Sequence, residues 1–266
     1  MKRLGITAKL VLGLGGILIG LALTVTVYSV ILLEQMLRLQ TMERVEAQGL
    51  KFTVGHDDII EQRIAREGAW EAEQFAFIAG KLKGQTFDVF LDMGANCGFY
   101  SLIAASKKLA SEVIAFEPDP GNRARLMRNI EANGLAEEIW VLDYALGDKP
   151  GETTLTEGSR HNRGESYLAQ DIMPAGETTH RVRVVRFDDE FKIKGKRVYV
   201  KMDVEGYEFR VIDGMERTLK ENSCFLQIEI FADDPEKLKR RVTGLGYRYL
   251  GTVEFDHFFT NIPGIE

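Results

Sequence analysis

The pattern of hydrophobic and polar positions divides the chain into an apolar amino-terminal segment and a longer part. In the longer part, strand-like and helix-like patterns alternate. The 24 residues from Leu10 to Leu33 include no charged side chain, and about 20 apolar residues are enough to cross a bilayer core. Residues 1–9 precede this segment and are basic. The pattern therefore predicts a short basic segment followed by a transmembrane helix over residues 10–33.

A retained membrane anchor explains this segment better than a cleaved signal peptide, whose apolar region is only about 7–15 residues long. The positive-inside rule does not fix the orientation, because basic residues on the two sides are nearly balanced. Gly16 and Gly20 form a GxxxG pair, a spacing that lets two membrane helices approach closely, so a homodimer stays open. The basic residues are Lys2, Arg3 and Lys9 before the span and Arg38, Arg44 and Lys51 after it.

Between the apolar segment and the alternating part, charged residues are interleaved with Leu, Met and Val. We interpret residues 34–66 as a helical stalk or linker. A second helical pattern, EGAWEAEQFAFIAGKLK, follows directly and gathers Trp70, Ile78 and Leu82 near one face. It predicts a helix that packs on the domain it opens, which we assign to residues 67–266.

From residue 87 on, strand-like and helix-like patterns alternate. The short apolar runs VFLD, EVIAFEP and IWVLDYALG are separated by the helical patterns FYSLIAASKKL and NRARLMRNIEANG. Later, RVYVKMDVEG, a helix, the strand FLQIEIF and another helix repeat the order. Such an order is typical of βαβ units on a parallel sheet, so we predict an α/β fold.

Two stretches depart from the alternation. Between Gly151 and Glu190 the pattern becomes polar around SRHNRGES and holds two candidate edge strands, ETTLT and RVRVVRF. This indicates an inserted segment that carries function or flexibility. Near the carboxyl terminus, YRYLGTV and DHFFTNI predict a closing hairpin.

Composition narrows the classes of function. The 266 residues suffice for one domain of ordinary size plus an appendage. A formal net charge of -6 argues against nucleic acid as the main partner, because phosphate binding normally needs a basic face. Cys97 and Cys224 lack CxxC or Cys/His spacing, so neither a zinc site nor a disulfide framework is readable. We expect Cys97 to pack and not to act as a nucleophile.

The stretch FLDMGANCGFYS joins a strand to a helix through a glycine-rich turn, which leaves backbone N–H groups free for a ligand. A dinucleotide fold has GxGxxG here, but counting from Gly94, the second and third glycine positions hold Asn96 and Phe99. This argues against a diphosphate and favours a nucleoside-type cofactor without phosphate, such as S-adenosylmethionine. Glu117 ends the next strand, where such folds place an acid on ribose hydroxyls, and Asp143 ends the third, near the adenine.

In this order, FLDMGANCGFYS, FEPDP, the ALGD of LDYALGD, and VKMDVEGYE resemble the FkbM family of S-adenosylmethionine-dependent methyltransferases. The resemblance runs from about Trp70 to the carboxyl terminus and leaves out the predicted span. It implies a Rossmann-like class I methyltransferase fold, with a mostly parallel seven-stranded sheet and a carboxyl-terminal antiparallel hairpin. By position, it implies that the methionine part of the cofactor is surrounded by Asp92, Gly94, Asn96 and Gly98, the ribose by Glu117, and the adenine by Asp143 and Ala145.

Methyl transfer requires alignment of the acceptor and, for a hydroxyl acceptor, a nearby base that contributes about 10²–10⁴-fold. In VKMDVEG, the side chains of Lys201, Asp203 and Glu205 share one face of a strand, because side chains alternate. We expect Asp203 nearest the reacting centre and Glu205 holding a loop or the substrate. Salt bridges from these acids to Lys201, or a helix cap, are the alternative reading. A divalent ion held by Asp203 and Glu205 also stays open.

Further side chains are candidates for the site. His161 in SRHNRGES is a second candidate base, since imidazole titrates near neutral pH and this loop could close over the site. Arg160 and Arg163 beside it suit an anionic substrate group. Glu229 ends a buried strand, where a carboxylate is expected to be functional or paired. No cluster of His, Asp or Glu has clear metal-ligand spacing, so no metal is predicted.

We therefore predict a membrane-anchored methyltransferase that uses S-adenosylmethionine. The family resemblance implies transfer to a hydroxyl of a sugar, a glycan, a lipid-linked molecule or another small metabolite. Methylation at nitrogen or carbon, a noncatalytic nucleoside-binding membrane protein and, least favoured, an NAD-dependent oxidoreductase are the alternatives. Because the cofactor is made in the cytoplasm, we expect a single-pass protein with its catalytic domain on the cytoplasmic side.

Overall fold

The computed structural model describes residues 42–266 apart from 56–57, 160–161, 163, 165, 169–177 and 231–234, together with residues 21, 23–30 and 32–33. The chain divides into two compact units, residues 1–43 and residues 44–266. In the first unit, residues 23–30 are helical. The basic segment 1–9 and much of the predicted span, residues 10–20, 22 and 31, lie outside the described residues. Within the part of the chain that is described, no helix is both long enough and apolar enough to cross a membrane.

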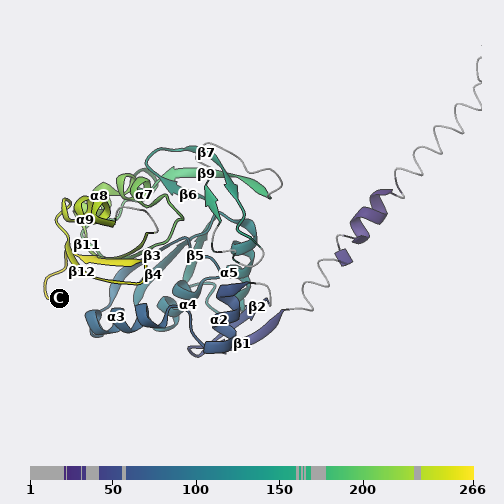
Figure 1. The fold of residues 1–266 in the computed structure, drawn as a ribbon, viewed down its shortest axis with the longest axis horizontal. Coiled ribbons are helices and arrows are strands. Elements are labelled where there is room, and N and C mark those ends of the chain that lie inside the picture. Colours follow the sequence, from purple (N-terminus) through teal and green to yellow (C-terminus); the bar gives the residue numbers. More distant parts are fainter. Residues whose placement is uncertain are drawn as a thin grey trace, which may run out of the picture. The chain divides into compact units, whose positions relative to one another are not determined.

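A mixed sheet of seven strands forms the centre of the second unit (Figure 1). In spatial order, its strands are β12 (Arg248–Val253), β13 (Asp256–Thr260), β11 (Ser223–Glu229), β10 (Arg197–Met202), β3 (Phe87–Met93), β4 (Ala110–Phe116) and β5 (Ile139–Leu142). The five strands from β11 to β5 run parallel, whereas β13 runs antiparallel to both of its neighbours. The predicted α/β fold and the predicted closing hairpin are thereby confirmed.

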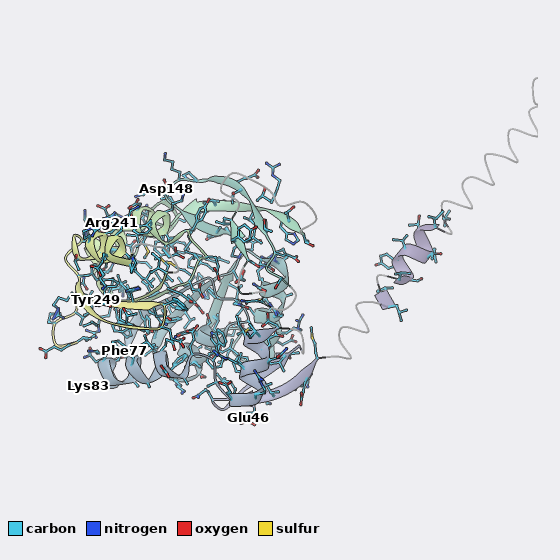
Figure 2. The ribbon with its side chains drawn as sticks, in the orientation of Figure 1. Glu46, Phe77, Lys83, Asp148, Arg241 and Tyr249 are labelled. Atoms are coloured by element: carbon cyan, nitrogen blue, oxygen red, sulfur yellow. The ribbon has the colours of Figure 1, made fainter. Side chains whose placement is uncertain are left out.

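Helices cover both faces of this sheet (Figure 1). One face carries α2 (Ile59–Glu67), α3 (Ala72–Leu82), α4 (Phe99–Ser106) and α5 (Pro120–Ala132), and the other carries α7 (Glu208–Gly214), α8 (Glu216–Glu221) and α9 (Pro235–Thr243). Side chains fill the space on both sides, and Phe77 of α3 packs on Phe258 of β13 with ring centroids 4.5 Å apart (Figure 2). Leu91 and Phe90 of β3 belong to different buried clusters, one on each face. Burial on both faces explains why these strands read as nearly continuous apolar runs.

The predicted insertion folds into a second sheet of four strands. In spatial order they are β6 (Ala145–Gly147), β9 (Thr179–Arg186), β7 (Gly151–Thr156) and β8 (Tyr167–Leu168). Strands β7 and β9 pair antiparallel and contain the two predicted edge strands. Leu155 and Val184 belong to the same buried cluster as Leu91 of the main sheet, so the two sheets share a core. The short helix α6 (Phe187–Glu190) follows β9 and precedes β10.

Residues 43–54 form a two-stranded hairpin, whereas the sequence predicted a helical stalk over residues 34–66. The strands of this hairpin are β1 (Glu43–Ala47) and β2 (Leu50–Val54). Gln48 and Gly49, both with positive φ, make the two-residue turn, a conformation that matches the twist of paired strands. The prediction of a helix was therefore wrong here, and residues 34–41 of the predicted stalk lie outside the described residues.

The burial pattern of β2 explains this error, because its buried residues alternate with more exposed ones at a period of two. Side-chain amides of α5 and of the residue that follows it, Asn133, also complete the hydrogen bonds of this strand. Asn133 accepts from the backbone N of Lys51 at 2.8 Å and donates to its carbonyl oxygen at 2.7 Å. Asn129 accepts from the backbone N of Thr53 at 2.8 Å. The hairpin is therefore part of the domain and not a linker.

Helix α2 also belongs to the folded domain, which therefore begins well before the predicted boundary at residue 67. Asp58 caps this helix, since its Oδ1 accepts from the backbone N of Ile60 at 3.1 Å and of Glu61 at 3.0 Å. Arg125 of α5 donates to Glu61 Oε1 at 3.0 Å and lies 3.8 Å from Asp58 Oδ2. All three charged side chains are buried, so a buried ion pair holds α2 on α5.

The helix predicted from residue 67 begins five residues later, at Ala72. Gly68 ends α2 in the left-handed conformation with φ 67, and Glu71 precedes α3 with φ 51. These two positions break what looked like one continuous helical pattern. Ile78 and Leu82 are buried, so the predicted packing of this helix on the domain is confirmed.

The ion pair of Arg125 provides a test of how α2 is held. Arg125→Met removes the cation from the buried carboxylate of Glu61, and breaking such a pair typically costs about 3–5 kcal/mol. We expect urea unfolding to show a loss of stability of this size. As a control, Arg66→Met on the exposed side of α2 should change the free energy of unfolding by less than about 0.5 kcal/mol. Equal stability of the two variants would contradict this account.

Candidate active site

Three strand ends meet at the glycine-rich turn that follows β3. The backbone N–H groups of Gly94 and Ala95 both donate to the carbonyl oxygen of Phe116, at 3.0 Å each. The backbone N of Asp203 donates to the carbonyl oxygen of Met93 at 2.9 Å, which brings in the end of β10. Gly94 has φ +86, and a Cβ at this position would lie 1.8 Å from the carbonyl oxygen of Asp203. No side chain fits here, which explains the glycine.

The turn continues into α4 through two more residues in the left-handed region, Asn96 with φ 51 and Gly98 with φ 88. A Cβ at Gly98 would lie 2.3 Å from Cδ1 of Leu126, so this glycine allows α5 to pack closely. Burial raises the pKa of the Cys97 thiol to about 12, which keeps it protonated and agrees with a packing role. Asn129, which also bonds β2, donates to the carbonyl oxygen of Cys97 at 2.9 Å.

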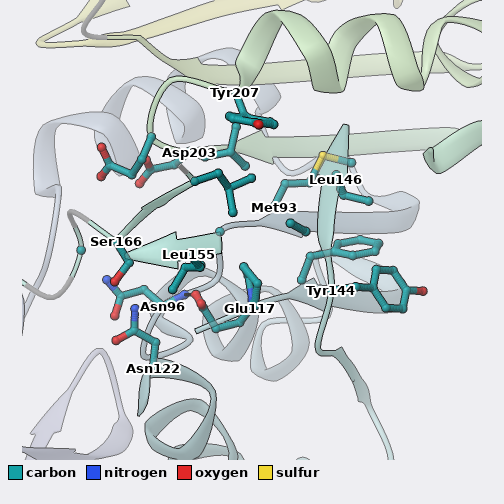
Figure 3. Close-up of a pocket in the computed structure, with 18 residues that line it drawn as sticks. Met93, Asn96, Glu117, Asn122, Tyr144, Leu146, Leu155, Ser166, Asp203 and Tyr207 are labelled. Atoms are coloured by element: carbon teal, nitrogen blue, oxygen red, sulfur yellow. Dashed lines mark hydrogen bonds between the residues drawn. The ribbon is translucent and has the colours of Figure 1, made fainter. Parts of the chain in front are cut away.

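Glu117 follows β4 and lines a pocket beside this turn, called here the turn pocket (Figure 3). Its carboxylate accepts from the backbone N of Asn96 at 2.7 Å and from the backbone N of Asp119 at 2.8 Å. Burial raises the pKa of Glu117 to about 7, although both hydrogen bonds favour the charged form. A carboxylate has about four acceptor positions, so it can accept two further hydrogen bonds from ligand hydroxyls.

The wall of the turn pocket formed by the second sheet and the end of β5 is apolar. Tyr144, Ala145 and Leu155 line it, and the ring of Tyr144 lies 6.0 Å from that of Phe116 (Figure 3). Asp143, predicted to lie near the adenine, is exposed and is not among the residues that line the turn pocket, so its place beside an adenine stays a prediction. It lies in the loop between β5 and β6.

A larger cavity of about 610 Å³ adjoins the turn pocket and is called here the large cavity. Asp92, predicted with the cofactor, lines this cavity and not the turn pocket. Ser101 Oγ donates to its Oδ2 at 2.5 Å, and burial raises the pKa of Asp92 to about 6. The two spaces meet at the residues they share, Gly94, Asn96, Gly164, Asp203 and Glu205.

The end of β10 brings a buried lysine to the large cavity. Lys201 Nζ lies 3.2 Å from Glu229 Oε2, 3.2 Å from Asp256 Oδ1 and 3.9 Å from Asp203 Oδ2. Burial alone would lower the pKa of Lys201, but the surrounding carboxylates raise it well above its usual value. The predicted grouping of Lys201 with Asp203 is confirmed, although the closest partners of the lysine are other carboxylates. Glu205 follows in a turn with φ 49 and lines both spaces.

Asp203 and Glu229 form a hydrogen-bonded pair of acids beside both spaces. Burial raises the pKa of Asp203 to about 7, and Lys201 opposes this rise. Burial and the charge of Asp203 raise the pKa of Glu229 to about 8. Because the ionisation of one acid disfavours the ionisation of the other, the pair titrates near neutral pH. The side chain of Asp203 is 29% exposed, so a ligand in either space can reach it.

Four residues not singled out from the sequence complete this cluster: Glu71, Tyr100, Gln227 and Asp256. The hydroxyl of Tyr100 donates to Glu71 Oε2 at 2.5 Å. Gln227 Nε2 donates to the Tyr100 oxygen at 2.8 Å and to Asp256 Oδ1 at 2.9 Å. Gln227 is a polar residue inside the buried strand FLQIEIF, and this position could have been noticed from the sequence. The others come together only through the fold.

Carboxylate oxygens of Glu71, Glu229 and Asp256 lie within 4.8 Å of one another, close enough to share a cation. Lys201 Nζ lies 3.2 Å from two of them and supplies positive charge at this point. Among the described residues, this group of three does not include Asp203 or Glu205, the pair considered for a divalent ion from the sequence.

The loop SRHNRGES extends over both spaces where the structure describes it. Gly164 lines both, and Asn162 lines the large cavity. Ser166 Oγ donates to Asp119 Oδ2 at 3.0 Å and accepts from the backbone N of Gly158 at 2.9 Å, which fixes the end of the loop near Glu117. The candidate base His161, with Arg160 and Arg163, lies outside the described residues.

Comparison with known proteins identifies the family to which this chain is similar. The profile described as the methyltransferase FkbM domain matches residues 92–249. The hexuronic acid methyltransferase AglP of Haloferax volcanii is 28% identical over 156 residues, which cover 58% of this chain and 60% of that protein. The AMB antimetabolite synthetase AmbE of Pseudomonas aeruginosa is 40% identical over 70 residues, which cover 26% of this chain and 3% of that protein. The chain thus spans less than two thirds of these relatives.

Solved structures include an FkbM methyltransferase from Methylobacillus flagellatus, with a TM-score of 0.44 and 19% identity, covering 65% of this chain and 43% of that one. The methyltransferase domain of METTL16 has a TM-score of 0.47 and 13% identity, covering 80% of this chain and 72% of that one. The family profile, which takes in more than half of the residues, confirms the resemblance predicted from the motifs. The chain belongs to the FkbM family of methyltransferases.

Proposed function

We propose that this protein transfers a methyl group from S-adenosylmethionine to a hydroxyl group. The observation that carries the proposal is Glu117, a carboxylate fixed by two backbone amides with acceptor positions left for the two hydroxyls of a ribose. Membership of a methyltransferase family supports the same donor. The adjoining large cavity leaves space for an acceptor beside it.

The residues of the turn pocket suit S-adenosylmethionine better than a dinucleotide. The second glycine of a dinucleotide motif lets a diphosphate approach the backbone, and here Asn96 places a side chain in the pocket instead. Phe99, at the third glycine position, is buried and packs on Phe52 with centroids 5.4 Å apart. Tyr144 and Leu155 provide an apolar surface for an adenine. This also argues against the alternative of an NAD-dependent oxidoreductase.

When bound, S-adenosylmethionine supplies a methyl group on a positively charged sulfur, and the C–S bond breaks as the C–O bond forms. The protein therefore has to align the acceptor, keep water out and receive the hydroxyl proton. Asp203 lines both spaces, so its carboxylate can accept that proton from a hydroxyl in the large cavity. Glu229 hydrogen-bonds to Asp203, and Lys201 keeps negative charge at this point stable. Glu205 borders the place where the two spaces join.

The kind of acceptor is part of the proposal. One relative is named as a hexuronic acid methyltransferase, which supports a sugar among the acceptors expected from the sequence. Transfer to nitrogen or carbon is the narrower alternative, and identification of the atom that carries the new methyl group separates these cases. A protein that binds the donor and never methylates an acceptor would correspond to the noncatalytic alternative.

We also propose that residues 10–33 anchor the protein in a membrane with the catalytic domain on the cytoplasmic side. The support is the length of this uncharged segment, which exceeds the approximately 20 residues a span needs. The donor is made in the cytoplasm, which favours that side. An anchor would hold the domain near acceptors that reside in or on the membrane.

Binding of the donor provides the first test. Glu117→Ala should weaken S-adenosylmethionine binding in calorimetry at least tenfold, about 1.4 kcal/mol, because the ribose hydroxyls lose their acceptor. Glu112→Ala, at an exposed position of the same strand, should leave the affinity unchanged. Absence of S-adenosylmethionine binding to the folded wild type, or tight NAD binding in its place, would refute the proposed donor.

The proton acceptor provides the second test. The rate of methyl transfer at low substrate should rise with pH through about 7 to 8, where the Asp203–Glu229 pair loses its proton. Asp203→Asn should lower the turnover rate by about 10²–10⁴-fold and change S-adenosylmethionine affinity little. A rate that falls with increasing pH in this range would exclude the pair as the base.

The same substitution has an expected effect on stability. The raised pKa of Asp203 means that the folded state favours the protonated acid, so this stabilising contribution is lost as pH rises from the unfolded value near 3.8 through about 7. Wild type should therefore lose melting temperature between about pH 4 and pH 7 relative to Asp203→Asn, with little further change above about pH 8. An identical pH dependence of the two proteins would contradict the raised pKa.

The anchor can be tested by fractionation. The full chain should sediment with membranes and stay there after a high-salt wash, whereas a chain of residues 42–266, which keeps the whole second unit, should remain in the supernatant. Thermal melting of both proteins controls for misfolding. Recovery of the full chain in the supernatant would exclude the anchor without touching the proposed activity.

A further inference from the structure

The large cavity is the place where an acceptor lies if the proposed function is correct, and the inference below rests on that function. This cavity of about 610 Å³ joins the turn pocket at Asp203 and Glu205. An acceptor atom that receives the methyl group must lie where the two spaces meet. The side chains around this point therefore decide which chemical groups are tolerated next to the reacting atom.

The lining of the large cavity is rich in carboxylates. Lys201, which lies among them, is already 3.2 Å from Glu229 and from Asp256, so its charge is shared with protein groups. Arg63 lines the outer part of the cavity and is exposed, with its guanidinium 5.4 Å from the ring centroid of Trp70. Among the described residues, the acidic side chains that line the cavity are Glu71, Asp92, Asp203, Glu205, Glu229 and Glu254.

Three of these glutamates are held in a backbone conformation that glutamate rarely adopts. Glu71 has φ 51, Glu205 has φ 49 and Glu254 has φ 51. In the left-handed region, glycine costs least and asparagine is tolerated, whereas other residues cost about 1–2 kcal/mol each. Glycine or asparagine at these positions would cause less backbone strain. Gln48, Lys83 and Lys108 adopt the same conformation elsewhere, so what sets these three glutamates apart is that all of them line the large cavity.

The lining of the large cavity has more carboxylates than cations, and this excess of negative charge helps to raise the pKa of Glu71. Burial raises the pKa of Glu71, and the charges of Asp256 and Glu229 add to the rise, although Lys201 opposes it. An additional anion placed here would meet like charges across a short distance in a poorly solvated space. Hydroxyl groups, in contrast, can donate hydrogen bonds to these oxygens.

We infer that the acceptor is an uncharged polyol, such as a neutral sugar ring, at least around the hydroxyl that is methylated, and that Glu71 helps to reject acceptors with a carboxylate beside that hydroxyl. This differs from a hexuronic acid acceptor, which the name of one relative specifies for that relative. An anionic group elsewhere on the acceptor can lie at the outer part of the cavity, near Arg63. The specificity comes from like-charge repulsion against the wrong acceptor.

The test uses matched pairs of glycosides that differ only in one carboxylate. Saturation-transfer NMR on the full chain, saturated with S-adenosylhomocysteine, measures binding of methyl β-glucoside against methyl β-glucuronide, and of methyl β-galactoside against methyl β-galacturonide. We expect the neutral member of at least one pair to bind at least tenfold more tightly than its uronide. Glu71→Gln should reduce this ratio at least threefold, because the amide keeps an acceptor for Tyr100 and removes the charge. Glu73→Gln, at an exposed position two residues further along, should leave the ratio unchanged.

Each other outcome overturns the inference. Equal or tighter binding of the uronides shows that the carboxylates do not reject anions, and failure of both members of both pairs to bind shows that the cavity does not take such rings. An unchanged ratio in Glu71→Gln removes the assigned role of Glu71. Calorimetry with S-adenosylmethionine on the same proteins, before S-adenosylhomocysteine is added, separates these results from failure of the proposed function, which would appear as loss of donor binding itself.

Discussion

The close contact between the turn after β3 and the end of β10 is the constraint on which the rest of the site depends. Gly94 has no room for a side chain because the carbonyl oxygen of Asp203 occupies that space, and the backbone N of Asp203 bonds Met93 in return. The same turn bonds the carbonyl oxygen of Phe116, just before Glu117. One backbone contact therefore sets the separation between the acid of the turn pocket and the acid that borders the large cavity.

Around this contact, the protein buries charged side chains of a kind that normally lie on the solvated surface. Lys201 is buried, and its ammonium joins strands β10, β11 and β13 through Glu229 and Asp256. Removal of the lysine would leave the carboxylates without a counter-charge, and removal of the carboxylates would leave the buried lysine without one. The cluster is therefore costly as a purely structural element, whereas a site that must accept a proton near neutral pH benefits from carboxylates with raised pKa values.

Local patterns in the sequence were enough for the sheet, its helices, the insertion and the glycine turn, because each depends on periodicity or on turn residues. They were not enough where distant residues decide the outcome. The hairpin over residues 43–54 is stabilised by Asn129 of α5 and by Asn133, which follows this helix, and a short polar stretch alone is equally compatible with a helix. Glu71 was not singled out from the sequence, because its partner Tyr100 is 29 positions away. Asp143 is exposed, whereas the next residue, Tyr144, lines the turn pocket, because the chain leaves β5 at this point.

Asn129 gives the fold an unexpected connection. Its amide accepts from Thr53 in the hairpin and donates to the carbonyl oxygen of Cys97 in the turn, so one side chain bridges the two. A displacement of Asn129 would therefore disturb a hydrogen bond of the hairpin and a hydrogen bond of the turn at once. The hairpin at the start of the domain is in this way tied, through a single side chain, to the turn that borders both spaces.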